Sequence, residues 1–212
     1  MEYADPVEKT PKAQRAVAAL LQSAREVFER RGYLDARVSD IAEGANLSSG
    51  AFYRYFTDKR HIMFNVLRQF ISESNDYVRV RFTEDEPLRS IRLSTERYLE
   101  FYAQHSNMHR LLLQVGKVDE EVELLRVEAT EHWHSRISRM LTRARELGLV
   151  DEAFDPDIAA TLLGAMCETY AYLAYGMGRD MEKDPKVVAD HITRLWESGV
   201  FSRTGGKGEV AR

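Results

Sequence analysis

The chain has 212 residues, 44% of them hydrophobic and 30% charged, so it is long enough to bury a substantial core in one or two domains. Its single cysteine, Cys167, excludes an internal disulfide and any zinc or redox site built from paired cysteines. The start of the chain is acidic, and no stretch approaches the roughly 18 consecutive apolar residues of a membrane helix. We therefore expect a cytoplasmic protein without a membrane partner.

Charge is distributed unevenly along the chain, although the formal net charge is only −4. Residues 11–60 carry nine Lys or Arg against six Asp or Glu, whereas residues 61–212 carry twenty against twenty-five. A mildly basic front end joined to an acidic body indicates a small binding module on a larger domain.

Apolar residues recur at helical spacing through most of the chain, and almost no segment alternates as a strand does. The predicted helices cover residues 12–31, 38–45, 49–55, 59–80, 87–105, 108–117, 119–147, 156–178 and 185–200. Asp155-Pro156 and Asp184-Pro185 each pair an N-cap side chain with the preferred first helical residue, and Glu86-Pro87 predicts a third helix start. Gly32 and Gly148 are expected to end helices. The fold class is therefore all-α.

Residues 38–56 have the layout of a helix-turn-helix, with a short helix, a tight turn and a second short helix. Asn46 stands at the turn, where its tolerance of the left-handed conformation replaces glycine, and Ser48 or Ser49 is placed to cap the second helix. If Phe52 and Phe56 point inward, the outer face of that helix is short and polar and suits the major groove of DNA.

The candidate DNA-contacting residues lie on or beside this outer face. They are Arg37, Ser39, Ser48, Ser49, Gly50, Ala51, Tyr53, Arg54, Tyr55 and Lys59. We expect Arg54 to read guanine or hold a phosphate, and Lys59 to pair with a phosphate at the start of the next helix.

Four short motifs resemble the N-terminal domain of the TetR family of bacterial transcriptional repressors. They are Gly32-Tyr33, Asp40-Ile41-Ala42, Tyr53-Arg54-Tyr55-Phe56 and Lys59, within a resemblance that covers residues 12–64. The sequence departs from the family pattern at Arg37, Asn46 and Ser49, where many members have Thr or Ser, Gly, and Lys, respectively. The resemblance implies a ligand-responsive repressor that is released from its DNA operator by a small apolar or amphipathic effector.

The predicted architecture is an N-terminal three-helix helix-turn-helix domain at residues 1–57 and a bundle of about six helices at residues 58–203. The bundle is expected to bind the effector and to dimerise. Residues 204–212 contain three glycines and little apolar surface, so we expect a disordered tail.

The last two predicted helices are the candidate dimer surface. Residues 156–178 are apolar on nearly all sides and include Gly164 and Gly176, which favours cover by a partner chain over burial in a monomer core. A homodimer would read a palindromic operator with half-sites about 34 to 36 Å apart. The predicted interface residues are Ile158, Leu162, Ala165, Leu173, Val188, Ile192, Leu195 and Trp196.

The middle helices carry many bulky, adaptable side chains. Any one of them is more often core than pocket, but the family resemblance favours an effector site among them. The candidates are Phe64, Leu67, Phe70, Tyr98, Phe101, Tyr102, Met108, Leu112, Trp133, Ile137, Met140, Met166, Glu168 and Tyr170. An effector against Phe64, Leu67 and Phe70 is expected to rotate helix 59–80 and lower operator affinity.

No pattern in the sequence indicates a catalytic residue, a cofactor or a metal site. His105 and His109 are spaced i, i+4, and Glu131, His132 and His134 form another cluster, but solvent-facing histidines explain both. Two alternatives stay open. One is an all-α metal-binding or enzymatic bundle with a purely structural helix-turn-helix, and the other is a DNA-binding regulator that senses a protein partner or nothing.

Overall fold

The computed structural model describes residues 10–81, 83 and 86–201, and the predicted tail at 204–212 lies outside this range. The α-helices are α1 Pro11–Asp35, α2 Val38–Gly44, α3 Ser49–Phe52, α4 Lys59–Val78, α5 Pro87–Gln104, α6 Ser106–Gly116, α7 Glu120–Glu146, α8 Pro156–Ala171 and α9 Pro185–Gly199. A π-helical turn, Tyr172–Gly176, continues α8, and Val150 and Phe201 form an isolated bridge. The all-α prediction is confirmed. None of the described helices is both long enough and apolar enough to span a bilayer.

The chain divides into two compact units. The first, called the N-terminal unit, comprises residues up to Glu73 together with Asn107–Arg126; the second, called the body unit, comprises Ser74–Ser106 and residues from Val127 onward. Helices α4 and α7 each contribute to both units. These units are defined by compactness and not by function, so the predicted boundary after residue 57 between a DNA-binding and an effector-binding domain stays a prediction.

All three predicted helix starts are confirmed, two of them by side-chain caps, whereas α5 begins at Pro87 without a cap from Glu86. The Asp155 carboxylate accepts hydrogen bonds from the backbone N–H groups of Asp157 and Ile158, and that of Asp184 accepts one from Lys186. Pro156 and Pro185 follow as first helical residues, which need no intrahelical N–H donor. Gly148 ends α7 with a φ of 72°, as expected for a left-handed stop.

Two predicted helices end earlier than expected because their last turns change geometry. After α3 the backbone tightens, with Arg54 N donating to Ala51 O and Tyr55 N to Phe52 O, so the regular helix stops at Phe52. After α8 the backbone widens into the π turn, in which Met177 N donates to Tyr172 O.

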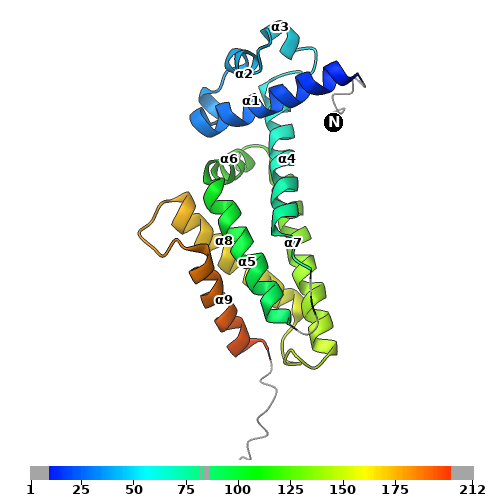
Figure 1. The fold of residues 1–212 in the computed structure, drawn as a ribbon, viewed down its shortest axis with the longest axis vertical. Coiled ribbons are helices and arrows are strands. Elements are labelled where there is room, and N and C mark those ends of the chain that lie inside the picture. The colour runs from blue at the N-terminus through cyan, green and yellow to red at the C-terminus, as the bar shows by residue number, and fades with distance from the viewer. Residues whose placement is uncertain (1–9, 82, 84–85, 202–212) are drawn as a thin grey trace, which may run out of the picture. The chain divides into compact units, whose positions relative to one another are not determined.

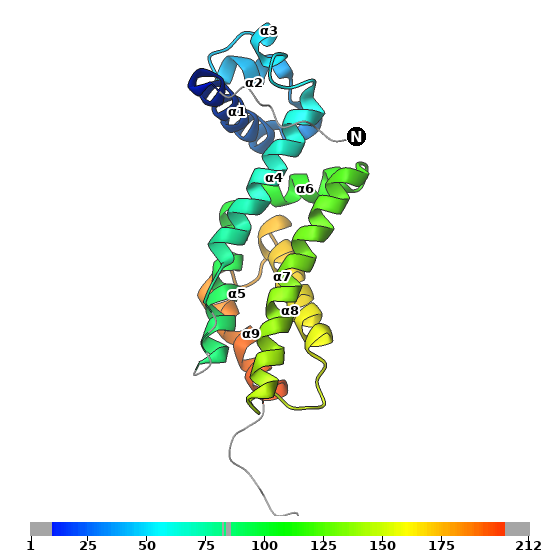
Figure 2. The same cartoon turned by 90° about the vertical axis from the view of Figure 1, so that its right-hand side faces the viewer.

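The core of the N-terminal unit forms where α1, α2 and α3 meet α4 (Figures 1 and 2). Leu20 of α1, Ile41 of α2, Phe52 of α3 and Leu67 of α4 are fully buried, and Phe56 is 1% exposed. The apolar stripe predicted on the first helix therefore packs on the helix-turn-helix and holds it in place.

The body unit has a separate core, in which α5 runs beside α8 and α9 (Figure 1). Leu99, Leu141, Leu163 and Trp196 are among its buried residues. Helix α8 passes so close to α7 that a Cβ on Gly164 would overlap the His134 ring and lie 2.8 Å from Trp133. Gly164 is thus explained by packing within the chain, which corrects its interpretation as a sign of dimerisation.

Candidate nucleic-acid interface and effector site

The turn between α2 and α3 has the geometry that its sequence predicts. Asn46 adopts a φ of 56°, and the backbone N–H of Leu47 donates to Ala42 O at 2.9 Å, which closes the turn. The Ser48 hydroxyl, rather than that of Ser49, accepts the N–H of Ala51 at 3.2 Å and caps α3. The buried ring of Phe52 packs this short helix against the core of the N-terminal unit.

The opposite face of α3 is polar and open. Ser48, Ser49, Gly50, Tyr53 and Arg54 are exposed, and Tyr53 reaches 58%. The Arg54 guanidinium lies 5.8 Å from the centre of the Tyr55 ring, in cation–π range, so the two side chains form one projecting group. The face offers hydroxyl and guanidinium donors of the kind that contact phosphates and base edges.

Four other predicted DNA-contacting residues differ in how exposed their side chains are. Arg37 and Ser39 are exposed at the start of α2, whereas Ala51 and Tyr55 are half-buried. Contact of these residues and of the open α3 face with DNA stays a prediction.

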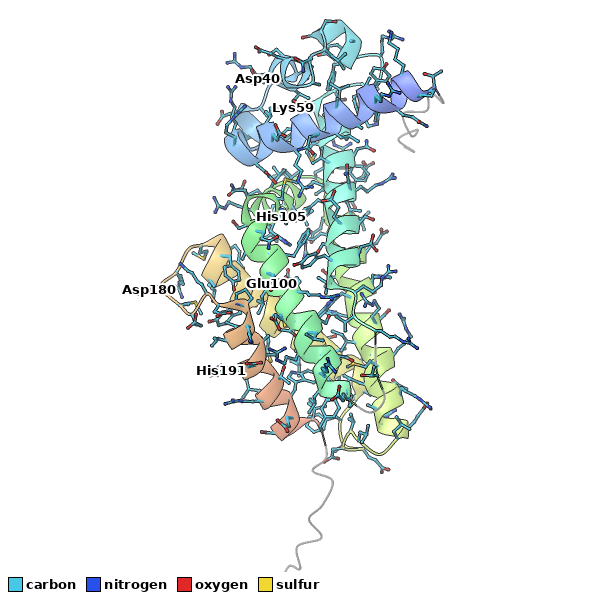
Figure 3. The ribbon with its side chains drawn as sticks, viewed as in Figure 1. Asp40, Lys59, Glu100, His105, Asp180 and His191 are labelled. Atoms are coloured by element: carbon cyan, nitrogen blue, oxygen red, sulfur yellow. The ribbon has the colours of Figure 1, made fainter. Side chains whose placement is uncertain are left out.

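Lys59 has a different role from the predicted one. Its ammonium donates to the carbonyl oxygens of Tyr33 at 2.8 Å, Leu34 at 3.2 Å and Ala36 at 2.8 Å, and lies 4.6 Å from the centre of the Tyr33 ring. Figure 3 labels Lys59 beside α1. An ammonium has three N–H donors, and all three are used here, so the predicted phosphate contact is corrected to a structural clamp.

The next residue, Arg60, joins the start of α4 to the turn between α6 and α7. Its guanidinium donates to both carboxylate oxygens of Asp119, at 2.5 and 2.7 Å, and to Glu121 at 2.9 Å. Hydrogen bonds from Arg60 lower the pKa of Asp119, burial opposes this shift, and the N–H of Val122 adds to it. The fork geometry fixes both position and orientation, because a guanidinium and a carboxylate match in two parallel hydrogen bonds.

The body unit contains a cavity of about 330 Å³. Trp133, Ile137 and Met140 of α7 line it, and all three belong to the predicted effector site. The sequence prediction missed the contributions of α5 and of the α7 arginines to this cavity. Three arginines at spacing i, i+3 and i+7 around Ile137 and Met140 were the signal that could have revealed them.

The other predicted effector residues do not line this cavity. Those buried in the packed interior are Leu67, Phe70, Phe101, Tyr102, Met108 and Leu112. Those half-buried elsewhere are Phe64, Tyr98, Glu168 and Tyr170, while Met166 is exposed. In the structure these side chains lie in or beside the two cores, and their contact with an effector stays a prediction.

The predicted dimer residues fall into two groups. Ile158, Leu162 and Leu195 are 63%, 59% and 62% exposed, and Ala165 is also exposed. Leu173 is half-buried, whereas Val188, Ile192 and Trp196 are buried in the core of the body unit. The last three were wrongly placed at a surface, because α9 turns them toward its own chain.

The histidines are distributed over several elements. His105 lies at the junction of α5 and α6, and His191 lies on α9 (Figure 3). Within residues 10–81, 83 and 86–201, no three His, Cys, Asp or Glu side chains converge as metal ligands would.

Together, the turn, the exposed face of α3 and the helical body define a helix-turn-helix transcriptional regulator with a separate ligand-sized cavity. Residues 20–66 match the sequence profile described as "Bacterial regulatory proteins, tetR family". This segment therefore forms a TetR-family DNA-binding domain.

Comparison with individual proteins agrees with this assignment. The chain is 23% identical to the HTH-type transcriptional regulator EthR of Mycolicibacterium smegmatis, over 91% of this chain and 93% of EthR. It is 29% identical to the HTH-type transcriptional activator FasR of the same species, over 79% and 76%. SmeT, the repressor of a Stenotrophomonas maltophilia multidrug efflux pump, was solved with triclosan and shares the fold with a TM-score of 0.69, at 19% identity over 93% and 97%.

The Lys59 clamp predicts that Lys59→Met destabilises the protein by about 1 to 3 kcal/mol, because three carbonyls lose a charged donor. The slope of log Kd against log salt for DNA should not change, since no phosphate contact is lost. In the matched variant Arg54→Met, stability should hold and the slope should fall by about one unit. Urea unfolding and DNA titrations at several salt concentrations measure both quantities; a slope change in Lys59→Met would contradict the clamp.

The Arg60–Asp119 pair predicts a pH dependence of stability. The pKa of Asp119 is lower in the folded chain than in the unfolded chain, so its stabilisation is present above the unfolded pKa and is lost as pH falls through the folded pKa. Wild type should therefore be more stable than Asp119→Asn at pH 7, with the difference shrinking toward pH 3. Denaturant titrations across this range test it, with the exposed Asp180→Asn as control; a difference that does not vary with pH would exclude the ion pair as its cause.

Proposed function

We propose that the protein is a homodimeric, ligand-responsive repressor that binds a palindromic operator through α3. The observation that carries this proposal is the open polar face of α3, anchored from beneath by the buried rings of Phe52 and Phe56. Arg54 is the proposed base-reading group, because a guanidinium matches the two acceptors of guanine in the major groove. Ser48, Ser49 and Tyr53 would hold phosphates.

The dimer would form on an apolar stripe of α8 and α9. Ile158, Leu162 and Met166 follow each other at i, i+4 and i+8 on α8, and Val187 and Leu195 lie eight residues apart on α9; all five are exposed. Five large apolar side chains on two helices are more than an isolated chain leaves in water without a reason. Paired across a two-fold axis, they would form a four-helix seam.

Coupling between ligand and operator would run through the ends of α4 and α7. Arg60 ties the first turn of α4 to Asp119 and Glu121 at the start of α7, and the Phe70 ring of α4 meets the His109 ring of α6 at 4.9 Å. A ligand that binds one arrangement of these helices better than the other would shift the population of operator-competent dimers. The dimer would repress transcription by occupying its operator, and loss of the operator-competent arrangement would end repression.

Selection from fragmented genomic DNA of the source organism tests the proposed function. The purified protein, at about 150 mM salt, should retain a few fragments that share a palindrome, because specific binding outcompetes the non-specific phosphate term. Arg54→Ala should weaken binding to the selected site by about 1 to 3 kcal/mol and relax the preference at one base pair per half-site. Retention without any shared sequence, or equal specificity in Arg54→Ala, would contradict this assignment of α3.

The dimer is tested by Leu162→Asp, which places a charge in the exposed stripe without touching the core. Wild type should sediment as a dimer and the variant as a monomer, with operator affinity falling as half-sites are read singly. Gln104→Glu, which adds a charge at another exposed position, is the control and should stay dimeric. A monomeric wild type that still binds the palindrome tightly would overturn the proposed interface.

A further inference from the structure

The cavity of the body unit has an apolar interior. Ile91 of α5, Trp133, Ile137 and Met140 of α7, and Leu163 of α8 supply much of its wall. At about 330 Å³ it lies within the size range of small-molecule sites. An apolar chain would fit this part without leaving any polar group unpaired.

The polar groups of the cavity wall differ in whether their hydrogen-bond donors are already used within the chain. The hydroxyls of Ser90 and Ser94 donate to the carbonyls of Arg81 at 3.3 Å and Val78 at 3.3 Å, so their protons are already engaged. The Thr95 hydroxyl, which also lines the cavity, is hydrogen-bonded to the Cys167 thiol. Three guanidinium groups of α7, from Arg136, Arg139 and Arg143, complete the polar part of the wall. The site therefore combines apolar walls with donors of positive charge.

The three arginines differ in how their charge is compensated. Arg143 donates to the Glu146 carboxylate at 3.0 Å, and Arg139 donates to the Ser135 hydroxyl at 2.9 Å. Arg136 is half-buried and forms no ion pair with any carboxylate in the described part of the chain. Burial lowers the pKa of Arg136, and the positive charges of Arg79 and Arg139 lower it further.

A half-buried guanidinium without a carboxylate partner destabilises the protein, because its charge is partly removed from water and the charges described near it, those of Arg79 and Arg139, are also positive. An anion in the cavity would remove this cost and accept the fork of N–H donors, which suits a carboxylate especially well. No cation gains anything beside Arg136, and a neutral ligand leaves its charge uncompensated.

We propose that this cavity binds an amphipathic carboxylate, with its apolar tail against Ile137, Met140 and Leu163 and its head group on Arg136. This inference rests on the proposed ligand-responsive function and names the chemical class of the effector. It also explains why α7 carries arginines on the face that lines an apolar cavity, where solvent exposure alone does not require them.

The test compares three probes that share one chain and differ in head charge: dodecanoate, dodecanol and dodecyltrimethylammonium, each below its micelle concentration. Calorimetric titration of the full-length protein should show dodecanoate binding at least about tenfold more tightly than the other two. Emission from Trp133 should change on binding, because its ring lines the cavity whereas Trp196 is buried in the core. Equal or tighter binding of the alcohol or the cation would overturn the proposal.

Arg136→Met keeps the aliphatic stem and removes the charge, and Arg145→Met, on the same helix but outside the cavity wall, is its control. Arg136→Met should weaken dodecanoate at least about tenfold and leave dodecanol unchanged. It should also raise the Tm of the ligand-free protein, which no merely structural role of Arg136 would do. Arg139→Met provides a second charge deletion if Arg136→Met does not fold. Identical ligand affinities in Arg136→Met and Arg145→Met would contradict the proposal.

Operator titrations with and without dodecanoate separate this inference from the proposed function. Selective dodecanoate binding supports the site even if operator affinity stays constant, in which case only ligand-dependent release fails. Specific operator binding by a protein that binds none of the three probes would leave the DNA-binding function in place and overturn the carboxylate site.

Discussion

The ammonium of Lys59 is the contact on which the N-terminal unit depends. Gly32, with a φ of 73°, interrupts α1, and the residues that follow leave carbonyls at the helix end without helical donors. Lys59 satisfies three of them and places a positive charge where the helix dipole is negative. Because α4 begins at this lysine, the same contact closes the chain segment that carries α2 and α3. The four-residue helix α3 can therefore be held in place, although it is far too short to be stable alone.

The arginines show how one residue type serves opposite purposes. Arg60 is compensated by Asp119 and Glu121, and its fork joins two helix ends at little cost in buried charge. Arg136 forms no such pair with the residues that the structure describes, so its charge lowers the stability of the body unit and leaves a site that an anion would complete. An arginine that already pairs with a carboxylate of the chain, such as Arg60, serves the structure, whereas one without such a partner, such as Arg136, can bind an anionic ligand.

The helix-turn-helix could be predicted from sequence because its determinants are local. Asn46, Ser48 and the Phe52–Phe56 pair act on neighbours within a few residues, as do the Asp-Pro caps of α8 and α9. The role of Lys59 could not be predicted, since its acceptors lie more than twenty residues earlier in the chain. Nor could periodicity decide which side of an apolar helix faces its own chain. In the structure, α9 buries Val188, Ile192 and Trp196 in the core of its own chain. The sequence around Arg136 is that of an exposed helix position, but in the structure Arg136 lines a cavity together with residues of α5 and α8.

Helix α8 brings the proposed ligand site and the proposed dimer surface together. Leu163 lines the cavity, its neighbour Leu162 is exposed, and Gly164 allows the helix to lie directly against Trp133 of α7. This close contact at Gly164 leaves α8 little freedom to shift there without moving as a whole, because closely packed groups transmit displacement. A ligand that spreads α7 from α8 would therefore displace the apolar stripe of α8 as well. In the proposed two-fold dimer that displacement would occur twice, so a small shift at each cavity would be a shift of the dimer surface on both sides of the axis.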